Sequence, residues 1–269
     1  MRLTERMSPR RRSAASSAGL GLAAALTAIG TVALQHGLAL PLVGPTLAAL
    51  AATGGTIGWR LVAADREERF LRRSFALYLA PQVIDRMIDA DAPPALGGEM
   101  RDVTVFFSDI AGFSSIAETM TPAALVAWMN TYLSEMTEIV EGCGGYVDKY
   151  IGDSIVAVFG APANDPDHAT HAVRAALRCC DRLAALNGTA AFAGHRLSHR
   201  IGLNSGEALV GNIGSRRRFN YTVMSDAVNL ASRLEGANKY FSTAIMASET
   251  TVERTGDAFA WRELDAIRT

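Results

Sequence analysis

Two different patterns of apolar and polar positions divide the chain. Between residues 13 and 59 there is no Asp, Glu, Lys or Arg, and His36 is the only ionisable side chain. A helix that crosses a bilayer needs about 20 predominantly apolar residues, so this run is too long for one crossing and long enough for two. The pattern predicts a transmembrane hairpin within residues 18–62, with one helix over 18–36 and a second over 42–62.

Clusters of arginine lie on both sides of this apolar run. They are Arg2, Arg6, Arg10, Arg11 and Arg12 before it, and Arg60, Arg66, Arg69, Arg72 and Arg73 after it. Because positively charged flanks stay on the cytoplasmic side, we expect a protein of the inner (cytoplasmic) membrane that contacts lipid through the hairpin. Residues 1–17 are then a basic cytoplasmic N-terminus. The competing interpretation is a secretory signal peptide, against which the second apolar segment argues.

Residues 63–98 form a predicted helical linker. Charged and apolar residues alternate there at helical spacing, and Pro81 divides the segment into two short helices. The linker is either a solvated connecting helix or a parallel dimer contact, because too few heptads are present to identify a coiled coil. Two prolines and the pair Gly97-Gly98 end it, so a separate domain is expected over 99–269.

From residue 99 onward, β-rich runs alternate with segments of helical periodicity. The predicted elements are, in order, a strand over 102–108, two helices ending at residue 142, a hairpin over 144–159, a helix over 167–186, strands over 197–204 and 207–213, and a helix over 226–235. Thr121-Pro122 is typical of a helix start, Gly152-Asp153 centres the hairpin turn, and Ser205-Gly206 is predicted to turn the chain between two strands. This order predicts an α+β fold, with helices packed on a mostly antiparallel sheet.

Charge and cysteine content exclude several classes of protein. The chain has 26 basic and 27 acidic side chains, a net charge of -1, which leaves no cationic surplus for binding nucleic acid. No nucleic-acid partner is therefore expected. The 3 cysteines, two of them adjacent at Cys179 and Cys180, are too few to cross-link a secreted domain of this size, so we expect a reducing compartment.

Two carboxylates occupy comparable places in the predicted sheet. Asp109 follows the first strand, and Asp153 lies at the tip of the hairpin. If these strands are neighbours, both carboxylates reach one point, where paired oxygens suit Mg²⁺ or Mn²⁺ that also binds substrate phosphates. Each Asp could instead be an ordinary turn residue. His168 and His171, three positions apart on a predicted helix, are a weaker candidate for a metal site because no third ligand has suitable spacing.

Three short segments together point to a known family. They are FSDI at 107–110, KYIGD at 149–153 and NLASR at 229–233. In order and spacing they resemble the class III adenylate/guanylate cyclase catalytic domain, and the resemblance extends over residues 99–269. It implies a ferredoxin-like fold, in which an antiparallel-rich sheet is covered by helices.

The resemblance implies a metal site and a reaction. Asp109, Asp153 and the backbone carbonyl of Ile110 are implied to bind two ions of Mg²⁺ or Mn²⁺. One ion would activate the ribose 3′-hydroxyl and the other would hold the triphosphate, while both offset the charge that grows on the α-phosphoryl group. The implied reaction converts ATP to 3′,5′-cyclic AMP and diphosphate.

The resemblance also implies which side chains recognise the purine. Lys149 lies where the family reads the base, and a lysine donates to adenine N1, whereas guanylate cyclases carry a glutamate there. Thr222 lies at the second purine-reading position, where many adenylate cyclases have aspartate and guanylate cyclases commonly have cysteine. A threonine resembles a bacterial subclass with some bicarbonate-stimulated members, and its hydroxyl can accept from the adenine 6-amino group. Without this context, Thr222 is an ordinary β-branched strand residue.

Asn229 and Arg233 are implied to act on the ribose and on the transition state. They lie four residues apart on a predicted helix and therefore share one face. In the family the asparagine orients the ribose, and the planar, charged fork of the arginine stabilises the pentavalent transition state. The alternative for Arg233 is a surface ion pair with Asp226 or Glu235. The resemblance further implies a head-to-tail homodimer, in which one chain supplies the carboxylates and the other supplies the remaining groups.

The resulting expectation is a membrane-anchored class III adenylate cyclase, a phosphorus-oxygen lyase. A guanylate cyclase is the alternative within the enzyme class, and Lys149 argues against it. A catalytically silent, cyclase-like signalling module is the alternative from a different class. Family members usually continue past a segment like 262–268 into a strand whose lysine holds the triphosphate, so either the end at Thr269 is a truncation or the arginines at 216–218 substitute.

Overall fold

The computed structural model describes residues 96–266, apart from 190, 191, 193, 195 and 216, and scattered positions between 21 and 59. The chain divides into two units, Met1–Tyr78 and Leu79–Thr269.

In the first unit, the described positions between 21 and 59 are helical except at His36 and Gly37, which form a turn. No transmembrane hairpin is evident among these positions, because no helix built from the described residues combines the length and apolarity that a bilayer crossing requires. Much of the predicted hairpin over 18–62, and the predicted linker as far as residue 95, lie outside the described residues.

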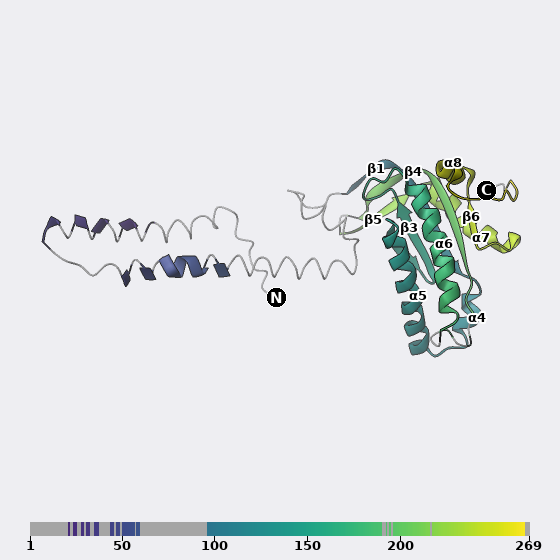
Figure 1. The fold of residues 1–269 in the computed structure, drawn as a ribbon, viewed down its shortest axis with the longest axis horizontal. Helices are drawn as coiled ribbons and strands as arrows, with labels where there is room; N and C mark the ends of the chain where they lie inside the picture. The colour runs from purple at the N-terminus through teal and green to yellow at the C-terminus, as the bar shows by residue number, and fades with distance from the viewer. Residues whose placement is uncertain are drawn as a thin grey trace. The chain divides into compact units, whose positions relative to one another are not determined.

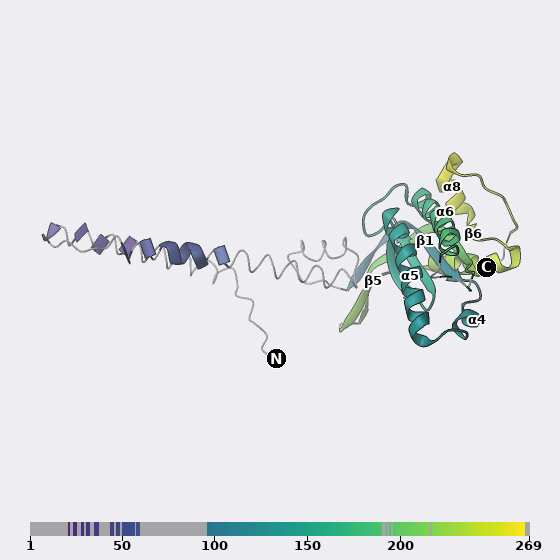
Figure 2. The same ribbon diagram turned by 60° about the horizontal axis from the view of Figure 1, so that its bottom comes forward.

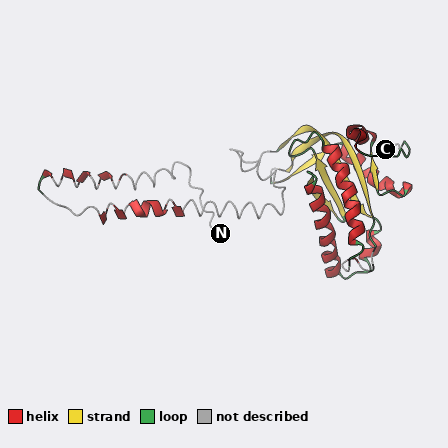
Figure 3. Ribbon diagram, in the orientation of Figure 1, coloured by secondary structure: helices red, strands yellow, loops and turns green. Residues whose placement is uncertain are grey.

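The second unit contains an α+β arrangement (Figures 1 and 3). Its described elements are β1 (Gly97–Ile110), α4 (Phe113–Ala117), α5 (Pro122–Gly142), β2 (Tyr146–Ile151), β3 (Ser154–Phe159), α6 (His168–Leu186), β4 (His199–Ser215), β5 (Arg218–Met224), α7 (Asp226–Phe241), β6 (Ile245–Ala247), α8 (Glu249–Thr255) and the 3₁₀ helix η2 (Gly256–Ala258). The sheet has the order β2-β3-β1-β4-β5 with antiparallel neighbours, and β6 pairs parallel with β4. The predicted fold class of this part is confirmed.

The sheet separates two hydrophobic layers. Successive side chains of a strand point to opposite faces, so Phe106 and Ile110 of β1 pack with α5 and α6, whereas Val103 and Val105 pack in the layer that includes α7. These four side chains are at most 1% exposed. Figure 2 shows α5 and α6 side by side over the sheet. By the same alternation, Asp109 lies on the α7 face of the sheet.

Local sequence signals were correct for α5 and for the β2–β3 hairpin. Thr121 caps α5 by accepting a hydrogen bond from the amide of Ala124 at 3.4 Å, and Pro122 is its first residue. The hairpin turn consists of Gly152 and Asp153, and Gly152 has a φ of 64°, which a glycine adopts without strain. This turn places Asp153 at the end of the hairpin.

The predicted turn at Ser205-Gly206 is wrong, because β4 continues through it without a break. In the ladder with β1, Ser205 lies opposite Thr104 and Gly206 lies opposite Val103. β1 begins at Gly97, earlier than predicted, so β4 has a partner for its backbone groups along most of its length. The hydrogen bonds of this long ladder outweigh the local turn preference of the dipeptide. Helix α7 also continues beyond its predicted end at residue 235.

The two edge strands of the five-stranded path, β2 and β5, meet through their side chains. The hydroxyl of Tyr146 donates to the carbonyl of Tyr221 at 2.7 Å, and the two rings pack edge to face at 5.8 Å. The pairing of β2 with β3 shifts register between Val147 and Lys149, which interrupts the regular alternation of side chains at Asp148. The Tyr146–Tyr221 contact thus joins β2 and β5, the two strands at opposite ends of the strand order.

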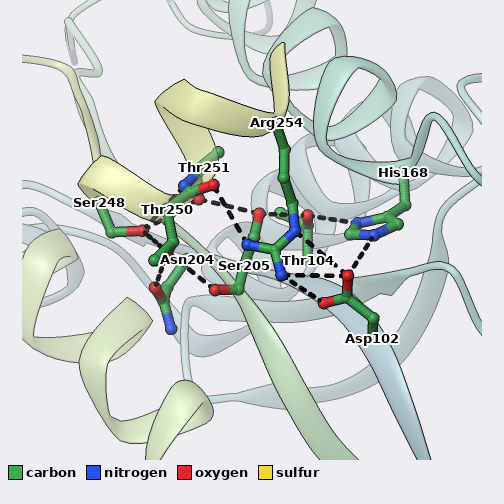
Figure 4. Close-up of polar contacts among 9 residues, drawn as sticks. All are labelled: Asp102, Thr104, His168, Asn204, Ser205, Ser248, Thr250, Thr251 and Arg254. Atoms are coloured by element: carbon green, nitrogen blue, oxygen red, sulfur yellow. Dashed lines mark hydrogen bonds and ion pairs between the residues drawn. The ribbon is translucent and has the colours of Figure 1, made fainter. Parts of the chain in front are cut away.

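A polar network with a buried centre and an exposed ion pair ties α8 to the sheet (Figure 4). The hydroxyl of Thr104 lies 2.7 Å from Nδ1 of His168 and 2.6 Å from the hydroxyl of Ser205, which continues to Thr251 at 3.0 Å. Arg254 at the end of α8 forms an ion pair with Asp102 of β1 at 2.9 Å. The same Asp102 lies 3.7 Å from Nε2 of His168. The network joins α6, α8, β1 and β4 at one place.

Candidate active site

The sheet brings the two predicted carboxylates together, as the sequence indicated. Asp109 lies near the end of β1, and Asp153 lies in the turn between β2 and β3, the strand that pairs with β1. The amide of Ile110 donates to Oδ2 of Asp153 at 3.1 Å, and the hydroxyl of Ser154 donates to Oδ1 of Asp109 at 2.8 Å. These cross-strand hydrogen bonds hold both carboxylates at the same edge of the sheet. The turn-residue alternative therefore describes the backbone position of Asp153 but leaves out its contact with β1.

The two carboxylates interact electrostatically. Partial burial raises the pKa of Asp153 above its ordinary value, and the nearby negative charge of Asp109 raises it further. A cation at this point would relieve both effects, since it favours the ionised form of each carboxylate. The donor set therefore fits a hard divalent ion with oxygen ligands.

Arg200 is a member of the site that the sequence did not reveal. Its guanidinium donates to Oδ2 of Asp109 at 2.8 Å, and its Nε lies 3.0 Å from Oε1 of Glu235 in an ion pair that is not aligned as a hydrogen bond. Arg200 lies directly opposite Asp109 in the β1–β4 ladder. The available sequence signal was a charged residue within an amphipathic strand, but only the register shows that it faces Asp109.

The two predicted purine-reading residues also contact each other. Nζ of Lys149 on β2 donates to the hydroxyl of Thr222 on β5 at 3.1 Å. Thr222 is 8% exposed, whereas the side chain of Lys149 is 46% exposed. A third residue, Asp148, accepts a hydrogen bond from the Thr222 hydroxyl at 2.7 Å, and the sequence had not indicated it.

Asn229 and Arg233 are exposed on α7 and line one cavity of about 380 Å³, together with Asp226, Ala227 and Leu230. Their shared helix face is confirmed. Among the described residues, Arg233 forms no ion pair, while Glu235 pairs with Arg200. The guanidinium of Arg233 is thus available to an anion at this cavity.

The predicted site residues therefore form three groups: the carboxylates with Ile110, the pair Lys149 and Thr222, and the pair on α7. Within the described residues no hydrogen bond or ion pair joins one group to another. A larger cavity, of about 710 Å³, is lined by Cys180 and His199. His199 is the neighbour of Arg200 along β4, so it points to the opposite face from Arg200 and Asp109, and we do not assign this cavity to the site.

The two histidines of the weaker metal candidate contact different partners. His168 lies against Thr104, whereas Nδ1 of His171 lies 2.7 Å from a carboxylate oxygen of Asp165. In the part of the chain that the structure describes, no group of three or more His, Cys, Asp or Glu side chains converges as a metal site. The carboxylate pair contributes two such ligands, so further oxygen ligands must come from backbone, water or substrate.

The amino-acid sequence is similar to those of bacterial and cyanobacterial adenylate cyclases. Adenylate cyclase 1 of Rhizobium meliloti (strain 1021) is 35% identical over 196 residues, which cover 72% of this chain and 30% of that protein. An adenylate cyclase of Anabaena cylindrica is 33% identical over 205 residues, covering 75% of this chain and 39% of that protein. The chain thus spans less than half the length of these relatives.

Solved structures of cyclases share the fold. A bacterial light-regulated adenylyl cyclase has a TM-score of 0.66 at 27% identity, covering 80% of this chain and 61% of its own. The guanylyl cyclase Cya2 has a TM-score of 0.56 at 36% identity, covering 60% of this chain and 82% of its own. Residues 98–267 match the family described as the adenylate and guanylate cyclase catalytic domain. All the predicted site residues lie within this matched segment, and the chain belongs to the class III adenylate/guanylate cyclase catalytic domain family.

Proposed function

We propose that the protein is an adenylate cyclase, which converts ATP to 3′,5′-cyclic AMP and diphosphate. The observation that carries this proposal is the convergence of Asp109 and Asp153, held across β1 and the β2–β3 turn by hydrogen bonds from Ser154 and Ile110. Membership of the cyclase family supports the reaction class. The similar proteins include both adenylate cyclases and a guanylyl cyclase, so the family alone does not select the nucleotide. The purine-reading pair is the basis for choosing ATP.

Asp109, Asp153 and the carbonyl of Ile110 are the residues that would hold Mg²⁺ or Mn²⁺. When bound, the ions supply Lewis-acid activation of the ribose 3′-hydroxyl and neutralise charge on the triphosphate. Partial burial and the negative charge of Asp109 both raise the pKa of Asp153, which supports this assignment because a bound cation would stabilise the ionised carboxylates. Arg200 supplies one positive charge beside Asp109 from within the chain.

Lys149 and Thr222 would recognise the adenine base. The ammonium of Lys149 can only donate, which matches N1 of adenine and opposes the N1–H of guanine. The hydroxyl of Thr222 would accept from the 6-amino group. The exposed Lys149 and the largely buried Thr222 lie 3.1 Å apart, so both can reach one edge of a purine ring. This threonine supports placement in the bacterial threonine-type subclass.

The α7 groups would complete the site from a second copy of the chain. Arg233 is exposed and without an ion pair among the described residues, and its fork suits the oxygens of a phosphoryl group in the transition state. No described contact connects Arg233 with the carboxylates of its own chain. A head-to-tail homodimer would pair the carboxylates of one chain with Lys149, Thr222, Asn229 and Arg233 of the other, giving two equivalent sites.

The direct test is to incubate the purified full chain with ATP and Mn²⁺ and to quantify cyclic AMP and diphosphate. We expect one diphosphate for each cyclic AMP, no product after removal of the metal with a chelator, and less product from GTP. A dimeric protein that forms no product at high Mn²⁺ would contradict the proposal and favour the silent signalling module. Preference for GTP would favour the guanylate cyclase.

We also propose that the segment before the catalytic domain anchors it to the cytoplasmic side of the inner membrane. The support is the charge-free run between residues 13 and 59 and the arginines on both of its sides. Reporter fusions to either terminus test this topology. A periplasmic signal from the C-terminal fusion would rule it out.

A further inference from the structure

The hydroxyl of Thr222 has a defined direction in this structure. Its oxygen lies 2.7 Å from Oδ2 of Asp148 and 3.1 Å from Nζ of Lys149. An ionised carboxylate can only accept a hydrogen bond, and an ammonium can only donate one. The single proton of the hydroxyl therefore points to Asp148, and Lys149 contacts a lone pair. Toward any other group, Thr222 presents only its remaining lone pair.

Asp148 reaches Thr222 because of the irregularity in β2. In a regular strand the neighbours Asp148 and Lys149 would point to opposite faces of the sheet. The register shift between Val147 and Lys149 removes this alternation, and both side chains contact the same hydroxyl on β5. A bulge commonly redirects one side chain next to a functional site.

Asp148 is a buried carboxylate whose Oδ2 accepts from Thr222 at 2.7 Å and lies 3.2 Å from Nζ of Lys149. Its side chain is 1% exposed, and its Oδ1 is buried with no hydrogen-bond partner among the described residues. Burial raises the pKa of this carboxyl, and the hydrogen bond from Thr222 and the charge of Lys149 oppose that rise. A buried carboxylate with one unsatisfied oxygen costs folding free energy, so its effect on Thr222 is the better explanation for its place here.

We propose that Asp148 is a positioning residue that makes Thr222 an obligatory hydrogen-bond acceptor and thereby selects adenine over guanine. This inference rests on the proposed function, since it concerns the same purine site. A threonine hydroxyl by itself can either donate or accept, so it could serve the 6-amino group of adenine or the O6 of guanine. With its proton held by Asp148, it accepts from the 6-amino group and faces O6 with a lone pair.

The test is the substitution Asp148→Asn in the full chain. Asparagine has almost the same volume, but its amide can donate to Thr222, which frees the hydroxyl proton to point at the base. We expect the ratio of kcat/KM for ATP to kcat/KM for GTP to fall about 10-fold, the size of one neutral hydrogen bond. Structural damage alone would lower both activities together and leave the ratio unchanged.

The matched control is Asp102→Asn, which makes the same chemical change in the ion pair with Arg254, away from the purine site. It should leave the ATP-to-GTP ratio unchanged. The variant Thr222→Val then shows whether Asp148 acts through the hydroxyl, because valine keeps the shape and removes the group. In the Thr222→Val background, Asp148→Asn should change the ratio by less than about 2-fold. An equal change in both backgrounds would overturn the proposal.

Binding of 3′-deoxy-ATP and 3′-deoxy-GTP, which cannot cyclise, separates this inference from the proposed function. If the wild-type chain makes no cyclic nucleotide but binds the adenine analogue better, and Asp148→Asn loses that preference, the cyclase proposal fails and the inference stands. If the wild type makes cyclic AMP and Asp148→Asn keeps the full preference, the inference fails alone. Binding of neither analogue, or a preference for guanine, overturns the inference.

Discussion

The side chains of the carboxylate site carry more negative charge than their surroundings balance. Arg200 lies between Asp109 and Glu235, and burial together with the charge of Asp109 raises the pKa of Glu235, which Arg200 opposes. Asp153 has no described cation of its own. The site therefore has one cation for three carboxylates, and a divalent ion would restore the balance.

Asp109→Asn tests this charge arrangement. The substitution removes a proposed metal ligand and a charge that adds to the effect of burial on the pKa of Asp153, so the affinity for Mn²⁺ should fall and formation of cyclic AMP should fall about 100-fold or more. Titration calorimetry with Mn²⁺ and a cyclic AMP assay measure the two effects. Asp165→Asn, which changes a carboxylate that contacts His171, is the control and should retain both properties. Unchanged Mn²⁺ affinity in Asp109→Asn would contradict the assignment.

Among individual residues, the sequence indicated those that belong to short motifs, but it did not indicate the side chains that contact them. Asp109, Asp153, Lys149 and Thr222 could be named because each lies in, or at a set spacing from, a short motif. Arg200 could not, because its contact with Asp109 spans 91 positions and depends on the register of two strands. The same reason explains why the role of Asp148 at Thr222 was not predicted.

Among the secondary-structure elements, α7 depends on one glycine of the sheet. It packs against β4 at Gly202, where an added Cβ would overlap the carbonyl of Ala231 and the amide of Glu235. No side chain can yield there, because both overlapping atoms belong to the backbone of α7. The glycine thus sets how close the helix that carries Asn229 and Arg233 lies to the sheet.

Gly202→Ala should therefore displace α7. We expect a loss of about 1–3 kcal/mol in the free energy of unfolding, as for overpacking in a core, together with reduced cyclic AMP formation. Denaturant unfolding and the activity assay measure these effects. Gly236→Ala on α7 is the control, because a Cβ there meets no atom within 4 Å. It should be neutral, or stabilising by up to about 1 kcal/mol. Equal stability of Gly202→Ala and wild type would contradict this account.

His168, in the polar network beneath α8, should make the free energy of unfolding depend on pH. Burial lowers the pKa of His168 below its ordinary value of 6.5, Arg254 lowers it further, and the charges of Asp102 and Asp165 partly oppose this shift. As the pH falls below about 6.5, the unfolded chain takes up a proton that the folded chain resists. The free energy of unfolding should therefore decrease toward acid pH.

His168→Gln isolates this contribution, because glutamine does not titrate. His199, whose pKa burial lowers to about 4, acts in the same direction and is present in both proteins. The difference in unfolding free energy between wild type and His168→Gln should shrink between pH 7 and more acidic conditions. Parallel pH curves from denaturant unfolding would show that His168 does not titrate as described.

The elements themselves were predictable where local signals agree with the tertiary structure. The cap at Thr121 and the turn at Gly152 are examples, because each needs only neighbouring residues. The prediction of a turn at Ser205-Gly206 was wrong for the opposite reason. The long strand β1 offers hydrogen-bond partners to β4, and a prediction from neighbouring residues alone cannot include them.

For the whole molecule, the carboxylates and Arg233 have no described contact within one chain. Mixing two inactive variants therefore tests whether the site is shared between chains. If one chain supplies the carboxylates and the other supplies Arg233, then Asp109→Ala and Arg233→Ala should each be inactive alone. Mixed after subunit exchange, half of the dimers combine one of each, and each such dimer has one intact site. About a quarter of the wild-type activity should return.

The control for this experiment is a mixture of Asp109→Ala with Asp153→Ala. Both changes affect the same half of the site, so the mixed dimers contain no intact site and no activity should return. Recovery in this control, or no recovery in the first mixture from proteins that exchange subunits, would contradict a site shared between chains.

The sequence by itself determined the types of most elements and the chemistry that the chain carries. Periodicity, caps and short motifs act over a few residues, so helices such as α5 and α6 and the pair Asp109 and Asp153 could be read directly. Only the tertiary structure decided which side chains meet. Arg200 reaches Asp109 across 91 positions and Thr222 reaches Asp148 across 74, because strand register and the contact between the edge strands β2 and β5 are set by long-range pairing.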